Sequence, residues 1–267
     1  MGSSSIVNGN EQGWTSGRTL GLLAIAAAGL ALFLAIEARV KAPLMPLGLF
    51  RLRSVAASNV VGILWSAAMF AMFFLSALYL QLVLGYSPLE VGLAFLPANL
   101  LMGAMSLGLS AKLVLRFGIK PPLVGGMVLV ALGLALFARA PVDGSFVVDV
   151  LPSMLILGIG IGMAMNPLLL AAMSEVKPEE AGLASGVVNT AFMLGGALGL
   201  AVLARVAGAR TGDDTSAAAL VDGYHAAFVI GTVFAIAAGV TAAVFLRSGP
   251  APALDPHGMS ETATEVG

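Results

Sequence analysis

The residues of this chain that could do chemistry are uncharged polar, aromatic and thioether side chains inside long apolar runs. Amides and flexible thioethers beside aromatic rings suit a pocket for varied apolar ligands. The same side chains also occur where a helix faces lipid, with Trp anchored at the interface and amides bonded to a neighbouring helix. The sequence leaves both interpretations open for Asn59, Trp65, Met69, Phe73, Met163 and Asn166.

Ionisable groups are missing from the middle of the apolar runs. The acids lie in connections, tails or segment ends, and Glu37 and Asp149 come closest to a run. No Lys or His sits at the centre of a run, and His225 and His257 stand alone. Transporters usually mark a proton path with such groups. We therefore expect any proton-carrying carboxylate to come from outside this sequence.

Enzymatic chemistry has no candidate residues. There is no cysteine, no nucleophile beside a base and no cluster of metal ligands. The GIGIG stretch at 158–162 lies in an apolar run without the Lys-Ser/Thr of a phosphate-binding loop. The sequence thus predicts no enzyme, no catalytic residue, no metal and no cofactor.

The composition indicates an integral membrane protein. Hydrophobic residues make up 59% of the chain and charged residues 10%, with a mean hydropathy of +0.99. A soluble domain carries about 25% charged residues. The net charge is −1 without a basic tract, so the expected partner is the lipid bilayer and not nucleic acid.

Seven apolar runs are long enough to cross about 30 Å of hydrocarbon, and we expect no soluble domain. The expected parts are an extracytoplasmic segment, a linker helix with its connection, a six-helix bundle and a disordered cytoplasmic tail. Their bounds are 1–18, 19–53, 54–247 and 248–267. The runs themselves are 19–38, 55–84, 91–111, 122–139, 148–173, 183–208 and 224–246.

Lysine and arginine placement predicts the orientation. Connections on one side hold nine of these cations and the other side holds four, namely Arg18, Arg139, Arg205 and Arg210. The richer side is cytoplasmic by the positive-inside rule. The N-terminus is then outside and the C-terminus cytoplasmic. Because no signal precedes the first run, we hypothesise that further spans lie upstream.

The run at 181–199 is unusually rich in small residues. At about 100° per residue, Gly182, Gly186 and Gly196 fall on one face, and Gly195 and Gly199 fall roughly opposite. Small residues let membrane helices approach closely. We expect this helix to pack between two others.

The turn at 108–122 carries three cations at four-residue spacing, Lys112, Arg116 and Lys120, with Gly118 for a tight turn. Simple anchoring at the cytoplasmic surface explains this pattern. A latch that pairs with a neighbouring bundle in one conformation explains it equally well.

Four stretches together resemble the carboxyl-terminal half of a fourteen-span drug/proton antiporter of the major facilitator superfamily. The resemblance runs from about residue 9 to residue 246. The stretches are EARVKAPLMPLGLFRLR (37–53), ALYLQLVLGYSPLEVGLAFLP (77–97), GLSAKLVLRFGIK (108–120) and AGLASGVVNTAFMLGGALG (181–199).

This resemblance implies an all-α membrane fold: one linker helix, then a six-helix bundle of two inverted three-helix repeats. The amino-terminal half, missing or separately encoded, would supply the proton-coupling acids. In such bundles the first and fourth helices line the substrate cavity. The implied ligand contacts are therefore Trp65, Met69, Phe73, Met163 and Asn166.

The resemblance also assigns the turn and the glycine helix. Gly108, Arg116, Gly118 and Lys120 match a degenerate copy of the family's cytoplasmic loop motif, in which Lys112 occupies the place of an acid. The glycine helix would pack one neighbour in this bundle and one in the missing half.

The implied function is proton-coupled efflux of hydrophobic or amphiphilic drugs at the plasma (inner) membrane. Without its other half the chain should be inactive in transport. An alternative is a stand-alone half-size membrane protein with a structural or accessory role. A seven-span retinal protein needs a lysine in its last span, and the run at 224–246 has none.

Overall fold

The structure is a computed structural model in which the chain divides into two units, Met1–Gly48 and Leu49–Gly267. The described residues are 28–29, 32, 51–177 and 180–246.

Little of the first unit is described, and that little is helical: Ala28, Gly29 and Leu32. The rest of the run expected at 19–38 lies outside the described residues. The expected segment 1–18 and tail 248–267 lie outside them as well.

The described residues of the second unit contain six helical segments that are long and apolar enough to cross a membrane. They coincide with the six runs expected after residue 54, and the described residues contain no strand, so the all-helical membrane prediction is confirmed for them. The segments are α2 (Arg53–Leu78) with η3 (Tyr79–Val83), α3 (Pro88–Ala104) with η4 (Met105–Leu109) and α4 (Ser110–Phe117), α5 (Lys120–Phe137), η5 (Phe146–Val150) with α6 (Leu151–Met173), α7 (Ala181–Thr211), and α8 (Ala217–Phe245).

Local signals in the sequence set several helix ends. Ser87 and Glu90 form a reciprocal capping box at the start of α3. Gly118 adopts φ +79° after α4, a backbone conformation that favours glycine, and this creates the tight turn expected before α5. Ser216 caps α8, and its hydrogen bonds lower the pKa of the Asp214 carboxyl in the connection before it.

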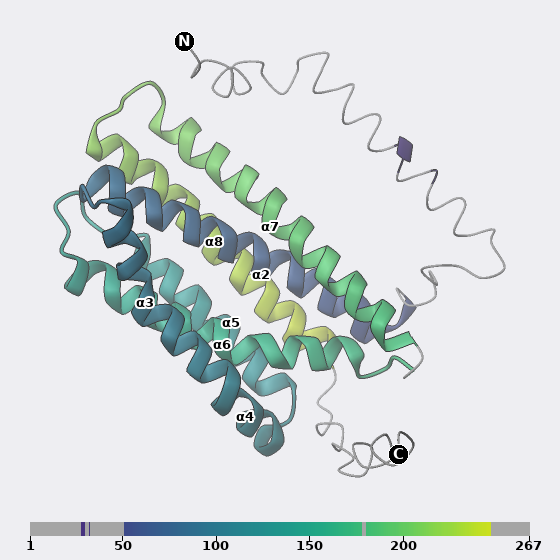
Figure 1. The fold of residues 1–267 in the computed structure, drawn as a ribbon. Coiled ribbons are helices and arrows are strands. Elements are labelled where there is room, and N and C mark those ends of the chain that lie inside the picture. Colours follow the sequence, from purple (N-terminus) through teal and green to yellow (C-terminus); the bar gives the residue numbers. More distant parts are fainter. Residues whose placement is uncertain (1–27, 30–31, 33–50, 178–179, 247–267) are drawn as a thin grey trace, which may run out of the picture. The chain divides into compact units, whose positions relative to one another are not determined.

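The six segments pack as two groups of three (Figure 1). In one group α2, α7 and α8 contact one another, and in the other α6 contacts both α3 and α5. Contacts of α5 with α8 and of α2 with α6 join the groups. Each group therefore combines helices from the first and the second half of the unit's sequence.

The contacts follow the pattern of two structural repeats. The first repeat is α2, α3 and α5, and the equivalent helices of the second repeat are α6, α7 and α8. The contact of α2 with α7 then corresponds to that of α6 with α3, and the contact of α2 with α8 corresponds to that of α6 with α5. The start of α2 meets the end of α6, because the Ser54 N–H donates to Glu175 Oε2 at 3.1 Å. The two equivalent helices thus run in opposite directions, as inverted repeats require.

Glycines of the GIGIG stretch bring the second group together. A Cβ on Gly158 would lie 2.6 Å from the Ala98 carbonyl oxygen of α3. A Cβ on Gly160 would lie 2.8 Å from the Gly126 carbonyl oxygen of α5. Successive glycines therefore serve two neighbours, and helix backbones approach closely on both sides of α6.

Most helices continue beyond the predicted apolar runs, which moves some charged groups into helices. Helix α8 begins at Ala217, so Asp222 and His225 lie within its first turns. Asp149 lies in η5. The described carboxylates still lie near helix ends or in connections. The hydrocarbon requires only about 20 residues, and the polar residues fall in the overhang.

Candidate functional site

The candidate ligand-contacting residues come from α2 and α6. Trp65 is fully buried, and its ring meets the edge of Phe192 in α7 at 5.5 Å between centroids. Phe192 also stands edge-on to Phe70 at 6.1 Å. Offset and edge-on pairs of this kind add to the energy of burial. The buried Trp65 side chain of α2 therefore packs against α7, whereas Phe70 and Phe192 are half-buried.

The Trp65 indole is also a buried polar group. Its Nε1–H has no hydrogen-bond partner among the described residues. Buried indole N–H groups usually find an acceptor. An acceptor from outside the described residues would complete this site.

Phe73 occupies a second aromatic contact on α2. Its ring lies 5.5 Å from that of Phe95 in α3. Both rings border a hollow of about 10 Å³ between α2, α3 and α6. That volume is at the lower limit for one water molecule, so this position is a packed seam. Met69, which lies between Trp65 and Phe73 in the sequence, is half-buried and packs against the core.

The two candidates from α6 point toward different neighbours. The Met163 side chain lies against α5, where its terminal methyl would be 3.2 Å from a Cβ on Gly125. Asn166 donates from Nδ2 to the Ser106 carbonyl oxygen at 2.6 Å. Ser110 returns a hydrogen bond to the Met163 carbonyl oxygen at 3.1 Å.

These two bonds join α6 to η4, a π-helical stretch, and to the first residue of α4. A π-helical turn breaks the regular backbone pattern and often marks a functional position. The Asn166 amide nitrogen thus donates to the backbone of the neighbouring segment.

The five predicted contacts do not line one pocket within the described residues. Trp65 belongs to the α2–α7 seam, Phe73 to the α2–α3 seam, and the α6 pair contacts α5 and η4. The half-buried rings form instead two contact pairs, Phe70 with Phe192 and Phe73 with Phe95, and we call these four residues the aromatic ridge. Such a ridge can bind apolar and aromatic surfaces without charge.

Three of the ridge residues, Phe70, Phe95 and Phe192, were not among the contacts predicted from the sequence. Phe192 interrupts the glycine-rich stretch of α7, and a lone aromatic residue among small ones was the available signal. Phe95 sits beside Pro97 in α3, and nothing in its own neighbourhood indicated the contact with Phe73.

The predicted glycine faces of α7 lie in contrasting surroundings. A Cβ on Gly195 would fall 2.5 Å from the Ile63 Cα, and Gly199 meets Ala67 of α2 even more closely. Within the described part of the chain, a Cβ added at Gly182 or Gly186 would have no atom within 4 Å outside the helix itself. One face is therefore a close seam with α2 and the other is open.

Gly196 is placed differently from the expectation. Its ideal Cβ would meet the Phe70 ring at 2.8 Å, so it faces α2 and not the open side. The helical position of Gly196 is about 40° from Gly182 toward Gly199, and the long Phe70 side chain reaches that far around the helix.

The loop-motif residues lie at the α4–α5 turn. Gly108 is in η4 beside open space, and Gly118 forms the turn. The Arg116 guanidinium lies 5.2 Å from the Phe117 ring centroid. Within the described residues neither Arg116 nor Lys120 forms an ion pair. The latch stays a prediction.

Three curated proteins illustrate the similarity to known sequences. The puromycin resistance protein pur8 of Streptomyces alboniger is 35% identical over 85% of this chain and 46% of its own length. The cephamycin export protein CmcT of Amycolatopsis lactamdurans is 34% identical, over 86% and 47%. The multidrug transporter protein MdtP of Bacillus subtilis is 31% identical, over 77% and 38%.

A family model covers most of the chain. The model described as Major Facilitator Superfamily matches residues 13–200. The chain spans about half the length, or less, of the curated relatives named above.

Proposed function

Because the chain belongs to the major facilitator superfamily, we propose that it acts as the carboxyl-terminal half of a drug exporter. The substrates are hydrophobic or amphiphilic compounds, and the driving force is proton exchange. In this proposal the domains are a linker helix with its cytoplasmic connection, residues 19–53, and the six-helix bundle of residues 54–247.

The aromatic ridge is the observation that carries the substrate class. Phe70, Phe73, Phe95 and Phe192 are half-buried, so they retain exposed ring surface while their positions are fixed by packing. Fixed aromatic rings bind apolar compounds with little ordering cost. Relatives named for multidrug transport and for antibiotic resistance or export support the same class.

The proton path is proposed to lie largely in another part of the transporter. The described carboxylates lie near helix ends or in connections, as Glu90 and Asp222 illustrate. A proton carrier needs an ionisable group inside the membrane. We therefore propose that this chain alone does not couple protons to transport.

We propose the orientation of the chain from the charges at the two ends of the bundle. Six described cations lie at the end where α2, α5 and α7 begin, against three at the other end. This favours a cytoplasmic location for the first end. The proposal therefore keeps the N-terminus outside and the C-terminus in the cytoplasm, at the plasma (inner) membrane.

The open stretch of α7 is the proposed contact with the amino-terminal bundle. No described residue lies close to Gly182 or Gly186, whereas the glycines further along the helix already pack on α2. Rocking of the two bundles against each other would alternate access to the ridge.

Reconstitution separates the parts of this proposal. The purified chain is placed in vesicles that trap a pH-sensitive dye, and puromycin is added outside. We expect puromycin to bind without a proton flux, because the ridge is present and the carrier is not. A puromycin-dependent proton flux from the chain alone would contradict the proposal that this chain does not couple protons to transport.

The ridge is tested by equilibrium binding of puromycin to two variants. Phe70→Ala should weaken binding about tenfold, the scale of a lost aromatic contact. Val229→Ala, at an exposed position of α8 away from the ridge, is the matched control. Equal binding by both variants, or no binding by the unmodified chain, would instead favour the accessory role.

A further inference from the structure

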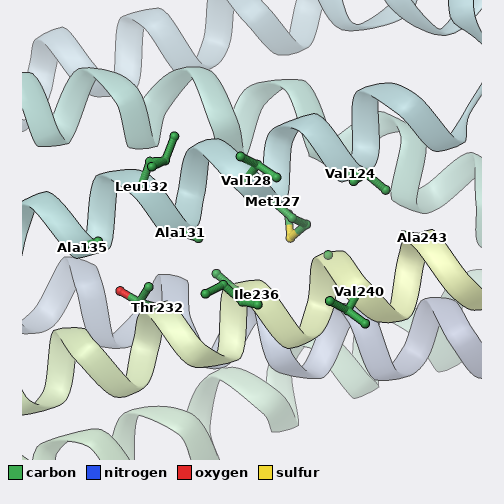
Figure 2. Close-up of a pocket in the computed structure, with 12 residues that line it drawn as sticks. Val124, Met127, Val128, Ala131, Leu132, Ala135, Thr232, Ile236, Val240 and Ala243 are labelled. Atoms are coloured by element: carbon green, nitrogen blue, oxygen red, sulfur yellow. The ribbon is translucent and has the colours of Figure 1, made fainter.

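A groove between α5 and α8 does not belong to the proposed export site. Its volume is about 430 Å³ and its lining is almost wholly apolar. Figure 2 shows the lining side chains of the two helices on either side of the groove. Thr232 is the polar lining residue, and its hydroxyl is bonded to the Phe228 carbonyl oxygen of its own helix. The described lining of the groove thus offers no free polar side chain.

The groove has a buried floor made mostly of small residues and half-exposed walls made of larger aliphatic residues. The floor is Met127 against Gly239, where a Cβ on the glycine would lie 3.2 Å from the Met127 Cβ. Ala131 and Ala235 extend this floor and are buried. The walls are half-exposed aliphatic side chains: Val128, Leu132, Ile236 and Val240.

The length of the groove fits one leaflet of a bilayer. It runs from Val124 to Ala135 on α5. At about 1.5 Å per residue this is roughly 17 Å, about half of the ~30 Å hydrocarbon thickness. An apolar channel of this length matches a single acyl chain.

Cations stand at one mouth of the groove. Lys120 begins α5, one helical turn before Val124. Arg53 donates from Nη2 to the Val244 carbonyl oxygen at 3.0 Å. Val244 follows Ala243, the last residue of α8 that lines the groove. Neither cation forms an ion pair among the described residues, and the nearby Glu175 carboxylate accepts from the Ser54 N–H.

We propose that this groove binds an anionic glycerophospholipid. One acyl chain lies between α5 and α8, and the phosphate lies between Lys120 and Arg53 at the membrane surface. Basic positions between membrane helices attract anionic head groups, and the apolar floor provides packing for the chain. The site is independent of the proposed export function.

The test uses tryptophan fluorescence of Ile236→Trp, which places an indole in the groove wall, after subtraction of the signal of the unmodified chain, which contains Trp14 and Trp65. The chain is reconstituted in phosphatidylcholine containing a minor share of phosphatidylglycerol with brominated acyl chains, and bromine quenching is measured. Leu107→Trp is the matched control. Leu107 is 90% exposed in η4, and both positions lie about 14 Å from the same end of their helices.

We expect quenching at position 236 to exceed the share of brominated phosphatidylglycerol several-fold, while quenching at position 107 follows that share. Lys120→Ala should lower the preference at position 236 about fivefold, as expected for one cation near the surface. Lys112→Ala, on α4, should not.

Two results would overturn the proposal. Equal quenching by brominated phosphatidylcholine and phosphatidylglycerol at position 236 would mean that no head group is selected. No quenching there by either lipid would mean that a protein segment covers the groove. Native mass spectrometry tests the same lipid preference without a substitution. The unmodified chain should retain phosphatidylglycerol in preference to phosphatidylcholine.

Discussion

Two stretches of α7 contain the same residue type in opposite surroundings. Gly195 and Gly199 are buried against the backbone of α2, whereas Gly182 and Gly186 meet open space. Glycine in a helix costs conformational entropy wherever it occurs. The buried pair recovers that cost by allowing close packing. The open pair recovers nothing within the described residues, which is why we assign it to a partner bundle.

The largest effect is expected at the buried stretch. Gly199→Leu forces a side chain into Ala67 of α2 and should lower the free energy of unfolding by about 3 kcal/mol. Unfolding in mixed micelles with increasing dodecyl sulfate measures this change. An unchanged midpoint would show that the α2–α7 seam can separate without cost.

The matched change at the open stretch should affect transport and not folding. Gly186→Leu should leave the unfolding free energy of the chain within about 0.5 kcal/mol. In a complete transporter it should reduce drug export about tenfold, because the added side chain blocks the other bundle. Val229→Leu on α8 is the control for a change at an exposed helix position. Full export by Gly186→Leu would remove the reason for the assignment.

A polar pair extends the comparison. Asn166→Leu removes the hydrogen bond to the Ser106 carbonyl oxygen and should cost about 1 kcal/mol. Asn189→Leu, on the open side of α7, should change stability little, because Asn189 is exposed. Equal losses for both variants would mean that the open side is engaged in the isolated chain.

The smallest expected effect is on the free energy of unfolding, which two alanine substitutions in α7 should change in opposite directions. Gly186→Ala should stabilise the chain by about 0.5 kcal/mol through helix propensity. Gly195→Ala should destabilise it, since the new Cβ would lie 2.5 Å from the Ile63 Cα. The same micelle titration compares them, and stabilisation by both would contradict the close seam.

The sequence predicted the helices of the second unit well. Apolar length alone placed six segments, and Gly118 marked the turn before α5. Helix ends were less accurate because helices continue into the polar boundary, as α8 does at Asp222. The hydrocarbon thickness limits the apolar run and not the helix itself.

The candidate site was predicted less completely. The polar and aromatic composition of α2 and α6 was visible, but the direction of each side chain depends on its neighbours. Asn166 donates a hydrogen bond to the Ser106 carbonyl oxygen in a π-helical turn, and no local sequence pattern indicated this contact. Phe192 reaches Trp65 across a seam that exists only because the glycines of α7 allow it.

Cysteine labelling at the open stretch tests the central claim most directly. Gly182→Cys is exposed at the start of α7, and Ala184→Cys, at a buried position, is the control. Maleimide reaction rates are compared between the chain alone and a complete transporter containing it. We predict that position 182 reacts quickly in the chain alone and at least tenfold more slowly in the transporter, while position 184 is slow in both. Equal rates at position 182 would show that no second bundle covers this face.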